Sequence, residues 1–208
     1  MSEAQIITFM LTSLAVIASP GQDMILVMSR AISQGAKAGI ATAFGVSVGL
    51  LGHTLLTAFG LGSLLLASQT LFTVLKFIGA GYLFYLGIRL IFSNKSDLAL
   101  KEVTHSPLRK LFREGAISNL SNPKVTIFYF AFLPQFISAD VSNPTLLLFT
   151  LGVAFAAITF LIKGPVGFFA GNLSSWLRAR PRIITWIDRI SGFVLIGLGL
   201  RLAFERNP

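Results

Sequence analysis

Two short polar interruptions within apolar runs are the parts of this chain best suited to chemistry. Residues 19–23 read SPGQD and lie between IITFMLTSLAVIA and MILVM. Residues 121–124 read SNPK and precede an aromatic-rich run. Each stretch combines a proline with a formal charge. Proline removes a helical hydrogen bond, so each stretch predicts a broken helix with free backbone groups.

The free backbone groups at such a break have a definite polarity. The helix segment after a break begins with unpaired N–H groups and positive dipole character, which suit a carboxylate. The segment before a break ends in free carbonyls, which suit an ammonium group or another cation. A zwitterionic amino acid carries both charges, so two breaks that face one cavity could hold it.

Both breaks are expected deep in a membrane. At ~1.5 Å per residue, Pro20 lies about 21 Å and Pro123 about 16 Å from the start of its apolar run. Asp23 and Lys124 then place charges where each costs at least ~2.5–3.5 kcal/mol, which favours a role in substrate binding or protonation. The alternative is a mutual salt bridge that locks the two helices together.

A polar stripe leads to the second break. Glu114, Ser118, Ser121 and Asn122 recur at helical spacing, with Asn119 beside them. Such a stripe either lines a cavity or packs on another helix through hydrogen bonds. The cavity is the favoured interpretation because the stripe ends at the break.

Two further polar residues in apolar runs have plainer explanations. His53, which is close to Thr54 and Thr57, could relay protons, but it could equally be a helix-packing histidine. Lys163 is expected to extend its ammonium group to the nearer membrane face. The candidate site residues for substrate and protons are Ser19, Pro20, Gly21, Asp23, His53, Glu114, Asn119, Asn122, Pro123 and Lys124.

The composition predicts that membrane-spanning helices position these residues. The 208-residue chain is 54% hydrophobic and 12% charged, about half the charged fraction of a soluble domain. Cysteine is absent, which excludes disulfides and thiolate metal sites, and the apolar runs hold few metal-ligating side chains. We therefore expect an all-α integral membrane protein that has no metal or other cofactor and forms one domain over residues 1–208.

Six apolar runs are long enough to cross ~30 Å of hydrocarbon. They cover roughly residues 5–28, 38–66, 70–93, 112–135, 145–170 and 184–204. Basic residues gather in the gaps after the first, third and fifth runs, whereas the gaps after the second and fourth have none. The positive-inside rule then predicts that both termini lie outside. No Lys or Arg precedes Arg30, so we expect the first run to remain as a spanning helix.

The two halves of the chain resemble each other. GIRLIF at 87–92 and GLRLAF at 199–204 are 112 residues apart, and SPGQD in the first span has its counterpart SNPK in the fourth. Because each half has three spans, the second would enter the membrane from the opposite side. This predicts two inverted repeats, 1–93 and 112–208, joined by a cytoplasmic linker at 94–111. Secondary transporters often have this arrangement; chance similarity between apolar helices is the alternative.

On these motifs the chain resembles the LysE/RhtB-type amino-acid exporters of the lysine-exporter superfamily. The matching residues are SPGQD at 19–23, KFIGAGYLFYLGIRL at 76–90 and, most specifically, NLSNPKVTIFYFAFLPQF at 119–136. One departure is Gln22, where the family commonly has a second proline. This puts the stiffness of the loop in doubt.

The resemblance implies a bacterial inner-membrane exporter of amino acids or derivatives, driven by proton antiport. Homoserine, its lactone, threonine and leucine-like compounds are the substrates it suggests. The glycine-rich faces, such as that of Gly45 and Gly49, permit close contacts within the chain or in a homodimer. The alternatives are an exporter of a metal ion or other small molecule and, less well supported, an intramembrane enzyme. A Ser19–His53 nucleophile–base pair would serve such an enzyme, but their spacing does not support it.

Overall fold

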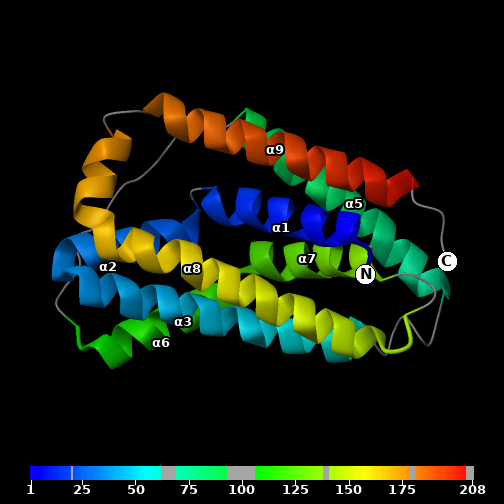
Figure 1. Ribbon diagram of the computed structural model, residues 1–208, viewed down its shortest axis with the longest axis horizontal. Helices are drawn as coiled ribbons and strands as arrows, with labels where there is room; N and C mark the ends of the chain where they lie inside the picture. Colours follow the sequence, from blue (N-terminus) through cyan, green and yellow to red (C-terminus); the bar gives the residue numbers. More distant parts are fainter. Residues whose placement is uncertain (20, 62–68, 93–105, 138–140, 179–180, 205–208) are drawn as a thin grey trace.

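The computed structural model describes residues 1–19, 21–61, 69–92, 106–137, 141–178 and 181–204, and every regular element in these ranges is helical. The elements are α1 (Glu3–Ala18), α2 (Gln22–Gln34), α3 (Ala36–Leu55), the π-helix η1 (Leu56–Leu61), α5 (Gln69–Ile91), α6 (Leu108–Leu120), α7 (Pro123–Phe132), the 3₁₀-helix η2 (Leu133–Phe136), α8 (Pro144–Arg178) and α9 (Pro181–Phe204). Figure 1 shows most of the helices extending along one long direction. The predicted all-α class is confirmed.

Within the described ranges, two helices are long and apolar enough to cross a membrane, Ala36–Gly60 and Pro144–Ala170. Helices α1 and α2 together make a third if they form one span, which is bent by 54° at the break between them. The outer surface is rich in exposed large apolar side chains, among them Phe59, Leu161 and Phe193. A soluble monomer rarely exposes so much apolar surface. The arrangement in six spans stays a prediction.

The first predicted break separates α1 from α2. Helix α1 begins with a capping box in which the Ser2 hydroxyl accepts from the Gln5 N–H and the Gln5 side chain accepts from the Ser2 N–H. It ends at Ala18 and is followed by Ser19, whose backbone is extended. Helix α2 begins after Gly21, also extended, and ends at Gln34, before Gly35, whose φ of 88° suits glycine. The helix is therefore interrupted beside the predicted SPG sequence, although Pro20 itself lies outside the described residues.

The second predicted break separates α6 from α7. The N–H of Asn122 donates to the carbonyl of Asn119, and its own carbonyl accepts from the N–H groups of Val125 and Thr126. Pro123 is the first residue of α7, a position where a helix needs no N–H donor. The proline thus starts a new helix instead of kinking a continuous one.

Helix α6 begins earlier than the predicted start of the fourth span at residue 112. It starts at Leu108, after Pro107 in an extended conformation. Arg109, Lys110 and Arg113 belong to its first turns and made this segment read as part of a polar linker. The helix is amphipathic there, so the charges did not prevent helix formation.

Helices α5 and α9 form an antiparallel pair in close backbone contact. A Cβ atom at Gly87 would lie 2.6 Å from the carbonyl oxygen of Gly192, and one at Gly199 would lie 2.8 Å from that of Ala80. The 112-residue offset of the two halves relates Ala80 to Gly192 and Gly87 to Gly199. The contact between Gly87 and Gly192 therefore corresponds to the contact between Gly199 and Ala80. Reciprocal contacts of this kind are what a two-fold axis between antiparallel helices produces.

Helices α3 and α8 form a second pair with the same reciprocity. Gly39 lies against Gly167, and a Cβ atom at Gly39 would lie 2.5 Å from the carbonyl oxygen of Gly167. Gly152 lies against Thr54. An offset of 113 residues relates Gly39 to Gly152 and Thr54 to Gly167. The close contacts of both pairs are thus reciprocal, and the inverted repeat itself stays a prediction.

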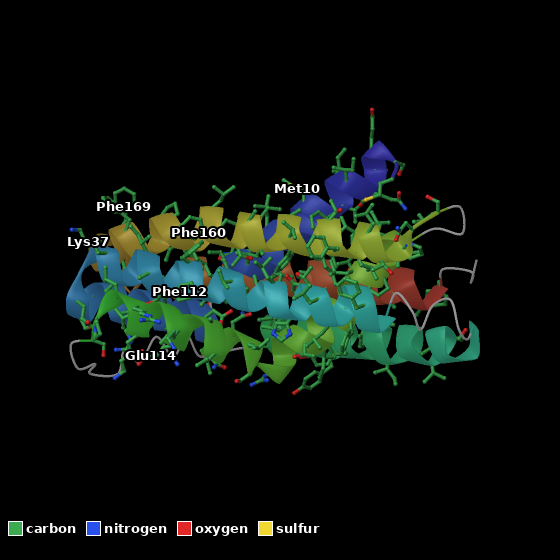
Figure 2. The ribbon with its side chains drawn as sticks, turned by 90° about the horizontal axis from the view of Figure 1, so that it is seen from below. Met10, Lys37, Phe112, Glu114, Phe160 and Phe169 are labelled. Carbon is green, nitrogen blue, oxygen red and sulfur yellow. The ribbon has the colours of Figure 1, made fainter. Side chains whose placement is uncertain are left out.

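The ends of the helices divide between the two ends of the molecule. Helix α2 ends, α6 begins and α8 ends at one end, whereas α1 begins and α9 ends at the other (Figure 1). Lys37 and Glu114 lie at the first of these ends (Figure 2). Which of the two ends faces the cytoplasm stays a prediction.

Candidate functional site

A buried ion pair lies next to the first break. Lys163 of α8 donates from Nζ to Oδ2 of Asp23 on α2 over 3.2 Å, and their side chains are 9% and 11% exposed. Asn119 of α6 donates from Nδ2 to the same Asp23 oxygen over 2.8 Å. Three helices that are distant in the sequence thus converge on one carboxylate oxygen.

The position of Lys163 corrects a prediction. Its ammonium group was expected to reach the membrane face, but the residue is 7% exposed and points to Asp23. A buried charge is stabilised when an opposite charge and hydrogen bonds compensate it, and Asp23 provides the opposite charge. The predicted partner of Asp23, Lys124, has its side chain outside the described residues, so that pairing stays a prediction.

His53 lies behind this carboxylate and is almost completely buried. Its Nε2 is 3.0 Å from the backbone oxygen of Asn119, and because a carbonyl only accepts, Nε2 must carry the hydrogen. Nδ1 faces the hydroxyl of Thr126 at 3.4 Å. Asp23, Asn119 and His53 therefore form a buried polar cluster that links α2, α6 and α3, and the partly buried Thr126 of α7 lies at its edge.

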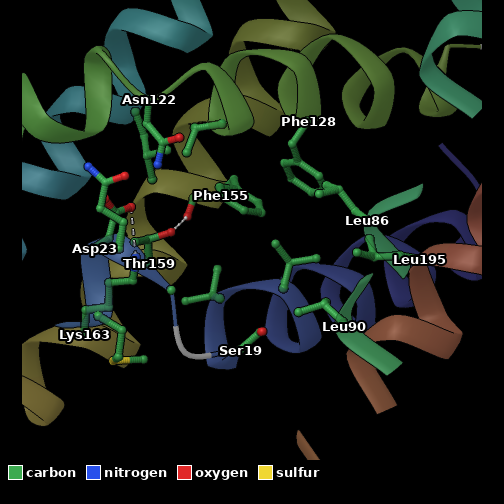
Figure 3. A pocket seen from close by; sticks show the side chains of 17 residues that line it. Ser19, Asp23, Leu86, Leu90, Asn122, Phe128, Phe155, Thr159, Lys163 and Leu195 are labelled. Carbon is green, nitrogen blue, oxygen red and sulfur yellow. Dashed lines mark hydrogen bonds and ion pairs between the residues drawn. The ribbon is translucent and has the colours of Figure 1, made fainter. Parts of the chain in front are cut away.

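A cavity lies between the two breaks, and the ion pair forms part of its wall. Its volume is about 110 Å³. One water needs roughly 10–15 Å³, so the cavity has room for several water-sized groups. Figure 3 shows Asp23, Lys163, Asn122 and Thr159 on one side of this space. The cavity thus has a polar side formed at the breaks.

The backbone ends of the first break also reach the cavity. Val16, Ile17 and Ser19 line it from the last turn of α1, and residues 21–24 line it from the first turn of α2. Gly21 caps α2 without a side-chain hydrogen bond. The cavity is therefore flanked by a helix end rich in N–H groups and by another rich in carbonyls.

One oxygen of the buried carboxylate lacks a partner. Asp23 Oδ1 is buried and accepts no hydrogen bond from any residue that the structure describes. An unsatisfied buried acceptor costs about 1–3 kcal/mol, and more when it is charged. Asp23 lines the cavity, so a bound molecule with N–H donors could satisfy this buried oxygen once the carboxylate turned toward it.

The polar stripe of α6 divides between two roles. Glu114 accepts from Arg30 of α2 over 2.6 Å, and Ser118 accepts from Gln22 over 3.2 Å. These contacts fit the alternative interpretation, in which the stripe packs on another helix. Asn122 lines the cavity, as the favoured interpretation requires.

The predicted site residues therefore fall into distinct groups. Those on the cavity wall are Ser19, Gly21, Asp23 and Asn122. Asn119 and His53 form the hydrogen-bonded layer behind it. Glu114 belongs to the ion pair with Arg30 and is not among the described residues that line the cavity. Pro20 and the side chains of Pro123 and Lys124 lie outside the described residues.

Sequence reasoning missed Lys163 and Thr159 as wall residues. The signal for Lys163 was a lysine within an apolar run, but its partner is 140 residues away in the sequence. Nothing in a single sequence indicates which helix face meets which. The apolar walls gave no signal at all, because apolar residues also face lipid.

Comparison with known families bears on this cavity. A family model described as LysE type translocator matches residues 14–206. The chain belongs to the LysE type translocator family. This confirms the resemblance inferred from the motifs. Membrane transport is accordingly the general function of this LysE-family protein, and its family is one of transporters.

Relatives match the LysE-family chain over nearly their whole length. "Uncharacterized membrane protein PA4757" of Pseudomonas aeruginosa is 31% identical over 201 residues, which cover 94% of this chain and 93% of the relative. "Uncharacterized membrane protein YrhP" of Bacillus subtilis is 30% identical, covering 88% and 90%. An "uncharacterized membrane protein" of Vibrio cholerae is 29% identical, covering 95% of each. No solved structure matches the chain significantly.

Proposed function

We propose that this LysE-family protein is a secondary transporter that exports amino acids or their derivatives from the bacterial cytoplasm by proton antiport. The observation that carries the proposal is the buried Asp23–Lys163 pair on the wall of a cavity between two broken helices. Secondary transporters commonly place their substrate sites at such interrupted helices near the membrane midplane.

A zwitterion complements this site in both of its charges. The carboxylate of an amino acid would bind Lys163 and the N–H groups at the start of α2. The ammonium group would bind Oδ1 of Asp23 and the carbonyls at the end of α1. Opening the ion pair alone would leave two buried charges unpaired, and a zwitterion compensates both.

Proton coupling follows from the chemistry of the same carboxylate. Asp23 can bind either a proton or the ammonium group of the substrate, and competition between the two is the basis of antiport. Protonation would also weaken its attraction to Lys163. The side-chain amide of Asn119 donates to Asp23 and its backbone carbonyl faces His53, so Asn119 and His53 form a hydrogen-bonded support for Asp23.

The topology proposed for transport uses six spans, with the basic ends of the helices in the cytoplasm and both termini outside. The reciprocal contacts of α5 with α9 and of α3 with α8 support this inverted-repeat arrangement. In such an arrangement the cavity between the two breaks would be reached from either side in turn.

A counterflow assay in proteoliposomes tests the proposal. Purified protein is reconstituted and loaded with a panel of unlabelled amino acids, and uptake of the labelled counterpart is measured with and without a pH gradient. We expect uptake that depends on the protein and that increases when a pH gradient is imposed. Movement of a metal ion in place of any amino acid would contradict the substrate class. Transport at the same rate with and without the pH gradient, and with and without an uncoupler, would contradict proton antiport.

A further inference from the structure

We infer that the exported amino acid has a large, apolar and uncharged side chain, of the kind found in leucine, methionine or phenylalanine. This inference rests on the proposed function of the cavity as an amino-acid site. It concerns the wall opposite the ion pair, which the binding of the amino and carboxylate groups does not use.

That opposite wall is apolar. Leu86 and Leu90 of α5, Phe128 of α7 and Leu195 of α9 line it. Figure 3 shows Leu86, Leu90, Phe128 and Leu195 across the space from Asp23 and Lys163. A molecule anchored at the ion pair would therefore extend its side chain toward leucine and phenylalanine.

The apolar wall is held by packing on its outer side. Phe128 stacks on Phe132 with ring centroids 4.9 Å apart, and its ring is 5.8 Å from that of Phe155. Leu86 and Leu195 belong to the α5–α9 pair, in which Gly87 and Gly192 bring the two backbones together. A wall that is fixed in this way keeps its shape for a ligand and does not collapse into the cavity.

The charges on the wall argue against a charged substrate side chain. Among the described residues that line the cavity, Asp23 is the acid and Lys163 the base. A zwitterionic backbone uses both of them. The additional ammonium group of lysine or carboxylate of glutamate would enter an apolar region without an opposite charge.

The hydrogen-bonding groups argue against a polar side chain as well. Among the polar wall residues, Asn122 and Thr159 lie on the side of the ion pair, whereas Ser19 lies nearer to Leu90 (Figure 3). The Thr159 hydroxyl already donates to the carbonyl of Phe155 over 2.8 Å. The hydroxyl of threonine or homoserine would lose its water where it meets the leucine and phenylalanine side chains, which offer no hydrogen-bond partner. Each buried methylene of an apolar substrate, by contrast, gains roughly tenfold or more in discrimination.

A competition experiment on the reconstituted full-length protein tests this inference. Counterflow of labelled leucine is measured against unlabelled leucine, methionine, phenylalanine, threonine, homoserine, lysine and glutamate. We expect the apolar amino acids to compete at concentrations roughly tenfold or more below those of the polar and charged ones. Preference for threonine, homoserine or lysine would overturn the inference and leave the proposed function standing. Transport of no amino acid would instead contradict the proposed function itself.

A pair of variants ties the preference to the wall. Leu86→Thr places a hydroxyl on the cavity wall, and we expect it to reduce the leucine-to-threonine preference roughly tenfold or more. Leu83→Thr is the matched control, because Leu83 is buried on the same helix but is not among the described lining residues. The preference is a ratio and does not depend on how much protein folds. An unchanged ratio in Leu86→Thr, or an equal change in both variants, would overturn the inference.

Discussion

The two broken helices are held by different means. Helix α6, which precedes the second break, lies with its backbone against α3: a Cβ at Gly49 would lie 2.7 Å from the Ala116 carbonyl oxygen, and one at Gly115 would lie 2.5 Å from that of Thr42. Helix α1, which precedes the first break, has no glycine contact of this kind within the described ranges. It is held by side chains, including Phe9, which stacks on Phe132.

The size of the residues at corresponding positions explains this difference. The offset of 113 residues that relates α3 to α8 places Ile158 and Ile162 at the positions of Gly45 and Gly49. Branched side chains hold two helix axes apart, whereas glycine lets them approach. Figure 2 shows the first turns of α1, before Met10, projecting beyond the neighbouring helices. One half of the cavity therefore has a fixed backbone, and the other half can adjust at lower cost.

Breaking the Asp23–Lys163 ion pair should have the largest effect, because it is the strongest polar contact between the first break and α8. Asp23→Asn and Lys163→Met each leave one buried charge unpaired, at a cost of about 3–5 kcal/mol. We expect each to abolish counterflow and to lower the melting temperature in detergent. The double variant should regain most of the stability and still fail to transport. Normal efflux in both single variants would assign the pair a purely structural role.

A bulky residue in the α3–α6 contact should have the next largest effect. Gly49→Val forces the two backbones apart, and overpacking of this kind costs about 1–3 kcal/mol or more. We expect a lower melting temperature and reduced transport. Gly81→Val is the control on α5, where no described atom lies within 4 Å of an added Cβ. Equal losses in both variants would show that helix propensity, and not the contact, is responsible.

The hydrogen bond between α1 and α9 should contribute less to stability than the contacts of the two preceding predictions. Ser191 donates from its hydroxyl to the carbonyl of Ala15 over 2.7 Å, and a typical hydrogen bond contributes about 0.5–1.5 kcal/mol. We expect Ser191→Ala to transport normally but to increase hydrogen exchange in α1 and leave exchange in α6 unchanged. Equal changes in both helices would contradict the difference between the two halves.

The Arg30–Glu114 pair should matter least. Its side chains are 14% and 31% exposed, so solvent screens part of the attraction, and a pair of this kind contributes about 1 kcal/mol or less. We expect Glu114→Gln to lower the melting temperature by a few degrees at most and to retain counterflow. Loss of counterflow with an unchanged melting temperature would instead place Glu114 in the substrate or proton pathway.

Much of the architecture was predictable because its cause is local. A proline beside glycine or asparagine cannot be accommodated within a regular helix, so the breaks at 19–21 and 121–122 follow from a few residues. Helix α6 starts four residues before the predicted fourth span, at Leu108, because its first turns are charged and resemble a linker. The site was predicted in part: Asp23, Asn119, Asn122 and His53 stand out as polar residues in apolar runs, and the structure brings them together.

The sequence by itself determined the helical class, the two interruptions and the presence of charges between them, because proline, glycine and apolar runs act within a few residues of themselves. Only the tertiary structure decided that Asp23 pairs with Lys163, that Glu114 pairs with Arg30 and that leucine and phenylalanine form the far wall. A helix that is apolar on every face does not reveal which face meets another helix. Packing makes that choice, and it joins residues more than a hundred positions apart.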